Sequence, residues 1–304
     1  MARKKYPNSF WHPVFWPTWL GFAIVWICAY LPWPVKYRLG KLIGLFILRV
    51  AHSRRKVTEK NIQLCFPELN PVDQKNLVRD VFIQNGIGLF ETATAWFRPK
   101  EKLRPITVVK NGHYMQDAID QGKGVIILGT HVSTLDLAGA VSGQFYDIDI
   151  FYRKHNNPLF EHIMTRCREK IYRDTIDKKD LKKAIRTLRK GNILWYTPDQ
   201  DFGPKVSVFA PFFGVEAATV SITGRLAKMT GSVPLPVSIS RTADNKYQLE
   251  FFPPLTDYPS GDDIADATRI NEVLEKVIRM HPDQYMWMHR RFKTRPEGEA
   301  SLYD

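Results

Sequence analysis

The stretch Val125–Asp136, VIILGTHVSTLD, decides the fold class and the position of the candidate site. It predicts a short buried strand at Val125–Leu128, and His131 follows that strand. Ser133 or Thr134 can cap a helix that begins directly afterwards. Open α/β sheets place their chemistry at the carboxyl ends of strands. The stretch therefore predicts an α/β fold with a site at His131.

Asp136 stands five residues after His131, in the first turn of the expected helix. Along one continuous helix the two side chains would diverge by roughly 140°, because each residue turns by about 100°. They can meet only if His131 lies in the turn before the helix. The carboxylate could then fix the imidazole tautomer and leave the other ring nitrogen free as a base. We predict that His131 and Asp136 form a general-base dyad for acyl transfer to a hydroxyl; a structural histidine is the alternative.

Length, charge and cysteine content narrow the class of protein. The 304 residues are 44% hydrophobic, which is enough for one large α/β domain. Lys and Arg outnumber Asp and Glu by 44 to 31, and a net charge of +13 predicts an anionic partner. Nucleic acid, an acidic carrier and an anionic membrane all fit that charge. The three scattered cysteines form no disulfide framework in the sequence and favour a reducing compartment.

The amino-terminal segment predicts a membrane anchor. Residues 6–35 contain no Lys, Arg, Asp or Glu and include five tryptophans, which suits a membrane interface. Pro17 and Pro32 leave 14 residues between them, about 21 Å of helix against a hydrocarbon core of about 30 Å. A helix that starts at Pro13 comes nearer to spanning, so a single span and a deep monotopic anchor both fit. We expect residues 1–35 to be the anchor and residues 36–304 a single α/β domain.

Basic residues on both sides of this segment predict its orientation. Arg3, Lys4 and Lys5 precede it, and a larger number of cations follows it between residues 36 and 56. The more basic side belongs in the cytoplasm, which places the body of the chain there. Apolar residues between Lys36 and Val50 recur at helical spacing. They predict a helix that lies on anionic lipid or one that packs on the body.

Strands and helices alternate through the rest of the chain. Residues 72–97 predict a long helix, and the last residues, 296–304, a loose tail. After Val125–Leu128 the pattern predicts strands at Ile148–Tyr152, Ile193–Thr197, Val206–Phe209, Val233–Ile239 and Tyr247–Phe252, and helices at Pro158–Lys170, Lys179–Lys190 and Val220–Thr230. This alternation favours a mostly parallel sheet flanked by helices.

Two further blocks follow predicted strands. In YRKHNNPL (152–159), Arg153 and Asn157 precede a helix and could grip a phosphate, although a plain turn also fits. In TPDQDFGP (197–204), Asp199 and Asp201 could position a substrate hydroxyl or hold Arg153. A tight loop built from Asp and Gly is the alternative.

Near the carboxyl terminus the run HRRFKTR (289–295) places Arg290 and Arg291 where they could bind phosphate or an acidic carrier, or form a solvated surface. No HExxH motif, Cys/His cluster, GxGxxG or GxxxxGK[ST] occurs, so we expect neither a metal nor a nucleotide cofactor. A membrane-tethered basic binder would explain the charge, but the chain has no recognisable nucleic-acid module. Such a binder would also leave the polar blocks at the strand ends without a role.

Taken together, the blocks resemble the late lipid A acyltransferases of Gram-negative bacteria, most closely the lauroyl-type branch. The resemblance covers nearly the whole chain and rests on the His-x4-acid block, YRKHNNPL, WYTPDQDFGP and five other stretches: WLGFAIVW (19–26), NIQLCFPEL (61–69), ETATAWF (91–97), VFAPFFG (208–214) and QYMWMHRRFKTRPEG (284–298).

The resemblance implies a glycerol-phosphate-acyltransferase-like α/β fold with an inner-membrane anchor and a cytoplasmic catalytic domain. It implies transfer of a fatty acyl chain from acyl carrier protein to the 3-hydroxyl of an acyl chain on Kdo2-lipid IVA, with lauroyl as the expected chain. His131 then corresponds to the general base, Asp136 to its orienting acid, and Arg153 to a contact for a glucosamine phosphate or the oxyanion.

One position departs from the family pattern. Lauroyl-type members commonly carry Glu where this chain has Asp136, and Asp is typical of glycerolipid acyltransferases, which are the alternative function. For the acyl chains, Trp96, Trp195, Phe212 and Phe213 are candidates to line an apolar slot, or ordinary core residues.

Overall fold

The computed structural model describes residues 7 and 9–303. The expectations for Arg3, Lys4, Lys5 and Tyr6 lie outside the described residues. Seven strands form one sheet, and every neighbouring pair is parallel except β8 and β9. The strand order is β1 (Thr107–Lys110), β9 (Tyr247–Phe251), β8 (Val233–Arg241), β2 (Val125–Leu128), β5 (Ile193–Tyr196), β3 (Ile148–Tyr152) and β4 (Asp174–Asp177). The predicted α/β fold with a mostly parallel sheet is confirmed.

Strand β2 occupies the middle of this sheet. It pairs in parallel with β5 on one side and β8 on the other, and all four of its side chains are buried. A strand covered on both faces needs an unbroken apolar run, which VIIL supplies. Because β2, β3, β4 and β5 run in the same direction, the residues that follow them gather at one edge of the sheet.

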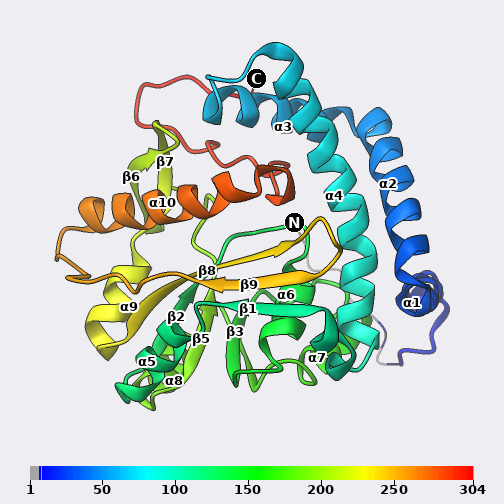
Figure 1. Cartoon of the computed structure of the whole chain (residues 1–304), viewed down its shortest axis with the longest axis horizontal. Helices are drawn as coiled ribbons and strands as arrows, with labels where there is room; N and C mark the ends of the chain where they lie inside the picture. The colour runs from blue at the N-terminus through cyan, green and yellow to red at the C-terminus, as the bar shows by residue number, and fades with distance from the viewer. Residues whose placement is uncertain (1–6, 8, 304) are drawn as a thin grey trace.

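Helices cover both faces of the sheet (Figure 1). A separate antiparallel hairpin, β6 (Ser207–Phe212) and β7 (Val215–Val220), packs beside the last helix. The covering helices are α5 (His113–Asp120), α6 (Leu135–Ser142), α7 (Pro158–Arg168), α8 (Leu181–Arg189), α9 (Ile222–Thr230) and α10 (Asp263–Met280).

The long helix α4 (Pro71–Phe97) joins the amino-terminal helices to this body. Asn70 caps it by accepting hydrogen bonds from the backbone N–H groups of Val72 and Asp73. Helix α2 (Trp33–Val50) crosses α4 closely, because a Cβ on Gly86 would lie 2.2 Å from the Gly40 carbonyl oxygen. Only glycine permits this approach. Helix α3 (His52–Cys65) then leads from α2 to α4.

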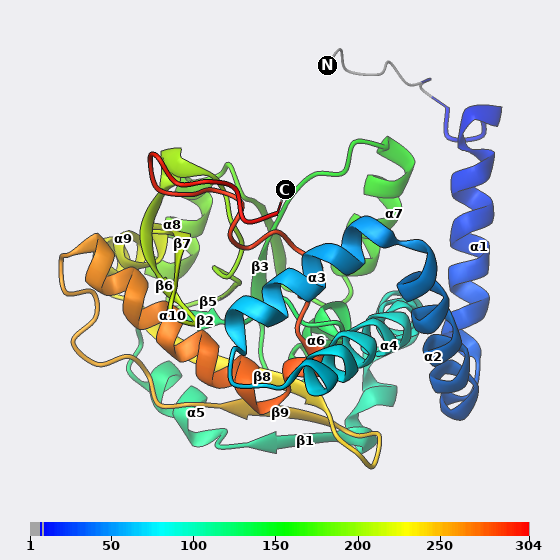
Figure 2. The ribbon, with the colours of Figure 1, turned by 90° about the horizontal axis from the view of Figure 1, so that it is seen from above.

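Helix α1 (Trp16–Tyr30) stands at the edge of the molecule beside α2 (Figure 2), and one stripe of its side chains packs on the body. Phe22 and Ala29, seven residues apart, are buried, and the Phe22 ring contacts the rings of Trp96, Phe97 and Phe160. The opposite stripe is exposed and apolar. By length and composition the segment Pro13–Tyr30, with a mean hydropathy of 1.4, could cross a membrane. One such helix is weak evidence for membrane association.

The carboxyl-terminal tail is ordered rather than loose as predicted. The Tyr303 hydroxyl donates to Asn61 Oδ1 at 2.5 Å and accepts from the backbone N–H of Phe292 at 3.1 Å. These bonds hold the tail against α3, so the expectation of a loose end, made from its position at the chain terminus, was wrong.

Candidate active site

His131 lies in the loop that leaves the carboxyl end of β2, as its position in the sequence predicts. The backbone N–H of Gly129 donates to the Tyr196 carbonyl at 2.9 Å and continues the pairing of β2 with β5. The His131 carbonyl accepts from the backbone N–H of Met286 at 2.9 Å. The loop is therefore fixed between β5 and the segment 284–286, which leaves the imidazole with little freedom.

The acid that holds His131 is Asp199, from the loop after β5. Its Oδ1 lies 2.5 Å from His131 Nδ1, and its Oδ2 accepts the backbone N–H of the same histidine at 2.8 Å. The Asp199 side chain is fully buried, whereas the His131 side chain is 20% exposed. One carboxylate therefore orients both the ring and the backbone of the histidine and leaves the ring open to a substrate.

The ionisation of Asp199 sets the tautomer of His131. Burial alone would raise the pKa of Asp199, but the charge and hydrogen bonds of His131 outweigh it and hold this pKa below its ordinary value. Burial and the Asp199 charge raise the pKa of Tyr285, so its hydroxyl keeps its proton and donates to Asp199. An ionised carboxylate only accepts, so Nδ1 carries the ring proton. Nε2 of the neutral ring is then a free base.

Two further side chains surround Nε2. The Thr197 hydroxyl oxygen lies 3.4 Å from it, and the ring of His289 lies 6.1 Å from the His131 ring between centroids. Burial lowers the pKa of His289, and its neighbour His131 lowers it further, which favours a neutral second imidazole. Tyr285 and His289 belong to the block 284–298 that the sequence singled out, although neither was predicted as a site residue.

The predicted contact between Asp136 and His131 is not made. Asp136 lies in the first turn of α6, where its carboxylate accepts from the Thr92 hydroxyl at 3.4 Å and lies 3.9 Å from Arg168. Among the residues the structure describes, no hydrogen bond or ion pair joins it to His131. The orienting acid is therefore Asp199, because β5 lies directly beside β2 and brings its following loop to the histidine.

Comparison with known proteins identifies the family of the chain. The model of the bacterial lipid A biosynthesis acyltransferase family matches residues 3–294. The chain belongs to this family. It is 41% identical over 301 residues to a lipid A biosynthesis lauroyltransferase of Escherichia coli, and 98% of each chain is covered. It is 38% identical over 301 residues to a lipid A biosynthesis palmitoleoyltransferase of the same organism, again with 98% of each chain covered.

A solved structure, the 1-acyl-sn-glycerophosphate acyltransferase of Thermotoga maritima, aligns with 82% of this chain and 96% of its own, at 16% identity and a TM-score of 0.35. The resemblance of the sequence to the late acyltransferases, and the expectation of an acyltransferase enzyme, are confirmed by the family match.

Three residues predicted to contact substrate make hydrogen bonds within the fold of the acyltransferase. Asn157 caps α7 and donates from Nδ2 to the Thr18 hydroxyl on α1 at 2.9 Å. Asp201 accepts from the backbone N–H of Thr294 at 2.6 Å and from its hydroxyl at 2.9 Å. Arg291 is 2% exposed and donates to the Ala218 carbonyl and the Thr219 hydroxyl. These polar atoms are engaged within the fold, and a role of the three residues in substrate binding stays a prediction.

The other two cationic candidates are accessible. Arg153 follows β3 at the same edge of the sheet as His131, and its side chain is exposed. Arg290 is also exposed, and its guanidinium lies 5.7 Å from the centre of the Tyr303 ring. Both remain available to an anionic substrate.

Arg291→Ala is expected to destabilise the acyltransferase by about 3–5 kcal/mol, because it leaves buried acceptors without donors. The adjacent, exposed Arg290→Ala is the matched control and should change stability by less than about 0.5 kcal/mol. Thermal and denaturant unfolding of both variants in detergent measures the difference. Equal, small effects would contradict the structural role of Arg291.

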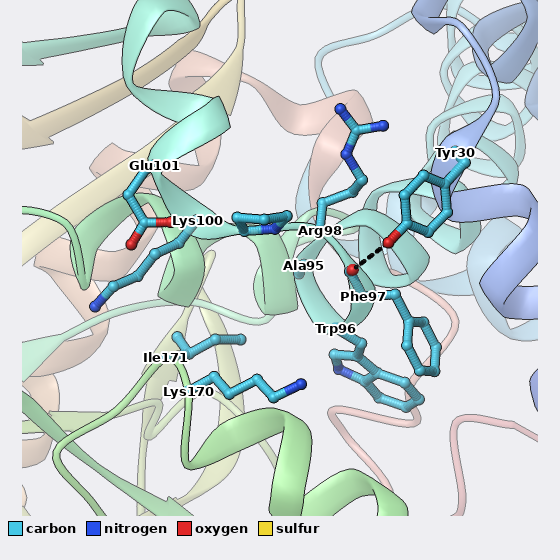
Figure 3. A pocket seen from close by; sticks show the side chains of 10 residues that line it. Tyr30, Ala95, Trp96, Phe97, Arg98, Lys100, Glu101, Lys170 and Ile171 are labelled. Carbon is cyan, nitrogen blue, oxygen red and sulfur yellow. Dashed lines mark hydrogen bonds between the residues drawn. The ribbon is translucent and has the colours of Figure 1, made fainter.

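A cleft of about 340 Å³ lies at the carboxyl end of α4, away from His131. Figure 3 shows the Tyr30 hydroxyl directed at the Phe97 carbonyl and the Lys170 side chain extending toward the Trp96 indole. Of the aromatic residues predicted to line an acyl slot, Trp96 lines this cleft, whereas Trp195, Phe212 and Phe213 are core residues. Within residues 7 and 9–303, no group of three or more His, Cys, Asp or Glu side chains is arranged to hold a metal ion.

Proposed function

We propose that this acyltransferase moves a fatty acyl chain from acyl carrier protein to the 3-hydroxyl of an acyl chain on Kdo2-lipid IVA, and that lauroyl is its preferred chain. The observation that carries the proposal is the contact of His131 Nδ1 with the buried carboxylate of Asp199, which leaves Nε2 free as a base. The family match supports a lipid A acceptor, and the relative at 41% identity supports lauroyl as the first donor to test.

The chemistry needs no covalent enzyme intermediate. His131 Nε2 takes the proton of the acceptor hydroxyl while that oxygen attacks the thioester carbonyl carbon. The new C–O bond gives a tetrahedral oxyanion, which collapses with cleavage of the C–S bond. The thiolate leaves and takes the proton back from the imidazolium. Asp199 stabilises the imidazolium between these steps, as a buried carboxylate does in other general-base pairs.

Two exposed arginines, the Asp136 carboxylate and the cleft at Trp96 have proposed supporting roles. Arg153 and Arg290 are exposed and would contact the anionic parts of acceptor or donor. Asp136, next to Arg168, would act on His131 only through longer-range electrostatics. The cleft at Trp96 lies one helical turn, about 6 Å, beyond Thr92, which contacts Asp136. With Lys170 and Arg98 on its walls, this cleft suits a phosphate-bearing lipid on its way to the site.

Product analysis tests the function. The purified protein is incubated with acyl carrier protein and coenzyme A donors, against Kdo2-lipid IVA and against glycerol phosphate or a lysophospholipid. Mass spectrometry of the lipids should show one added acyl group on Kdo2-lipid IVA. Acylation of the glycerolipid alone would assign the protein to the alternative function.

We also propose that α1 and α2 hold the enzyme on the cytoplasmic face of the inner membrane without crossing it. Phe22 and Ala29 tie the second half of α1 to the body, so a spanning helix would carry folded protein into the hydrocarbon core. The exposed face of α2 is apolar at Leu39, Leu42 and Phe46 and is flanked by cations. This pattern is typical of helices in the membrane interface.

The paired change Leu42→Asp and Phe46→Asp is expected to weaken binding to anionic vesicles by at least about 10-fold, since each side chain loses about 1.5–3 kcal/mol of burial in lipid. Both positions are 63% exposed, so the fold should not change. The control pair, Val72→Asp and Ile264→Asp, replaces side chains that are 67% and 55% exposed on other helices. Equal losses in both pairs would contradict an anchor at α2.

A further inference from the structure

A basic surface with an apolar centre lies at the carboxyl edge of the sheet. Its members are Lys178 and Lys179, which follow β4, and Phe202, Lys205 and Val206, which follow β5; we call these five residues the edge patch. All three lysines are exposed. Phe202 is 43% and Val206 54% exposed, so both apolar side chains are open to a partner. The Lys178 ammonium lies 5.4 Å from the centre of the Phe202 ring and joins the two halves of the patch.

The acids nearest in sequence to the edge patch are already occupied by the fold. Asp177 accepts from the backbone N–H of Lys179 at 3.0 Å, and Asp180 caps α8 by accepting from that of Lys183. Asp201 is bonded to Thr294. No ion pair of the described residues includes Lys178, Lys179 or Lys205. None of these carboxylates pairs with a lysine side chain of the patch, so the three ammonium groups beside Phe202 and Val206 are available to acidic side chains of a partner.

The edge patch lies close to the active site along the chain. Phe202 is three residues from Asp199, so their Cα atoms are at most about 11 Å apart. The same loop carries Thr197, whose hydroxyl lies beside His131 Nε2. An acyl donor seated on the patch could reach His131 along this loop.

The edge patch is far from the proposed membrane surface. Lys178 and Lys179 lie just before α8, and both views place α8 across the body from α1 and α2 (Figures 1 and 2). The lipid acceptor would approach from the side of α1 and α2. The patch is therefore open to a soluble partner while the enzyme sits on lipid.

We infer that the edge patch is the docking surface for an acidic protein that delivers the acyl group as a thioester. The inference rests on the proposed function and adds the place of donor binding to it. Acidic side chains of the carrier would face the three lysines, and an apolar residue of the carrier would cover Phe202 and Val206. Charge complementarity of this kind governs encounter and orientation more than the chemical step.

The test compares two donors of the same acyl group, one on the carrier protein and one on coenzyme A, with the full-length enzyme in detergent. The pair Lys178→Glu and Lys205→Glu should raise KM for the carrier-borne donor by about 10-fold or more. The rate with the coenzyme A donor should change less than about 2-fold. Phe202→Ser should raise the same KM with no change in net charge.

The matched control, Lys123→Glu with Lys190→Glu, makes the same charge change at exposed positions on the opposite edge of the sheet. It should leave both donors unaffected. Equal losses with both donors, or equal losses in patch and control variants, would overturn the docking surface. So would a loss of binding to vesicles that contain phosphatidylglycerol, which would make the patch a lipid contact.

Direct binding separates this inference from the proposed function. If the wild-type enzyme transfers acyl groups from neither donor, the proposed function fails. The affinity of the carrier protein for the enzyme, measured by titration, then still decides the docking surface. Tight binding that the patch variants lose and the control variants keep would support it, and absence of wild-type binding would refute it.

Discussion

Replacing His131 with alanine is expected to lower the rate of acyl transfer by about 10²–10⁴-fold, the usual contribution of a general base. Of the two described side chains that bond to Asp199, the His131 imidazole is 20% exposed and open to a substrate, whereas Tyr285 is buried. Removing the ring takes away the acceptor for the hydroxyl proton. KM should change little, because the ring acts in the chemical step rather than in binding.

The measurement is kcat with saturating donor and acceptor, together with the thermal midpoint of each variant. His113→Ala is the matched control, because that histidine is exposed at the start of α5 on another part of the surface. It should keep wild-type turnover. A folded His131→Ala enzyme with turnover near that of the wild type would show that another group is the base.

Local patterns in the sequence predicted the elements that are locally defined. The strand at Val125–Leu128 has the same bounds in the structure, and the long helix predicted at residues 72–97 begins one residue earlier. Strand β4, Asp174–Asp177, was missed because acids at both of its ends disguise an edge strand that is held by pairing with β3. Helix α10 was also missed, although Asp262 caps it and its apolar residues recur at helical spacing.

In the active site, the sequence pattern located the histidine but not its partner acid. His131 could be found because it follows a buried strand directly. Its partner could not, because Asp199 is 68 residues away and reaches it only through the pairing of β2 with β5. The nearer Asp136 was chosen on spacing, yet the first turn of α6 directs it to Thr92 and Arg168. Sequence spacing reports neighbours along a helix, and sheet order decides neighbours between loops.

The basic run 289–295 gives a second example. Arg290 and Arg291 are adjacent and chemically identical, but the first is exposed and the second is buried. No helix or strand is assigned there, and successive side chains of a non-helical chain can point in opposite directions. Charge composition alone therefore predicted two surface cations, whereas only Arg290 is at the surface and Arg291 is buried.

Replacing Asp199 with asparagine is expected to lower kcat by about 10²–10⁴-fold while the protein stays folded. An amide N–H next to Nδ1 favours the tautomer that carries its proton on Nε2, and that ring cannot act as a base. The measurement is kcat per folded molecule, with the folded fraction followed by circular dichroism. A purely structural role for Asp199 would lower the folded fraction and leave kcat per folded molecule unchanged.

The pKa of Asp199 adds a stability test to the kinetic one. Because this pKa lies below its ordinary value of 3.8, the native state binds fewer protons than the unfolded state as pH falls past that value. The stabilisation from the pair with His131 is therefore present above about pH 4 and is lost in stronger acid. The Asn variant should lack this part of the acid dependence when unfolding is followed from about pH 6 down to about pH 2.

Two other carboxylates serve as comparisons for Asp199→Asn: Asp201, which lies in the same loop, and Asp136, which lies in the His-x4-acid block. Asp201 lies in the same loop as Asp199, but its carboxylate is bonded to Thr294 rather than to His131. Asp201→Asn should therefore lower stability and leave kcat per folded molecule unchanged. Asp136→Asn removes a charge that acts on His131 only at longer range, which is worth about 1 kcal/mol, or roughly 5–10-fold in rate. If Asp136→Asn instead costs more than Asp199→Asn, the acid five residues after the histidine is the orienting partner during turnover, and Asp199 serves the resting enzyme.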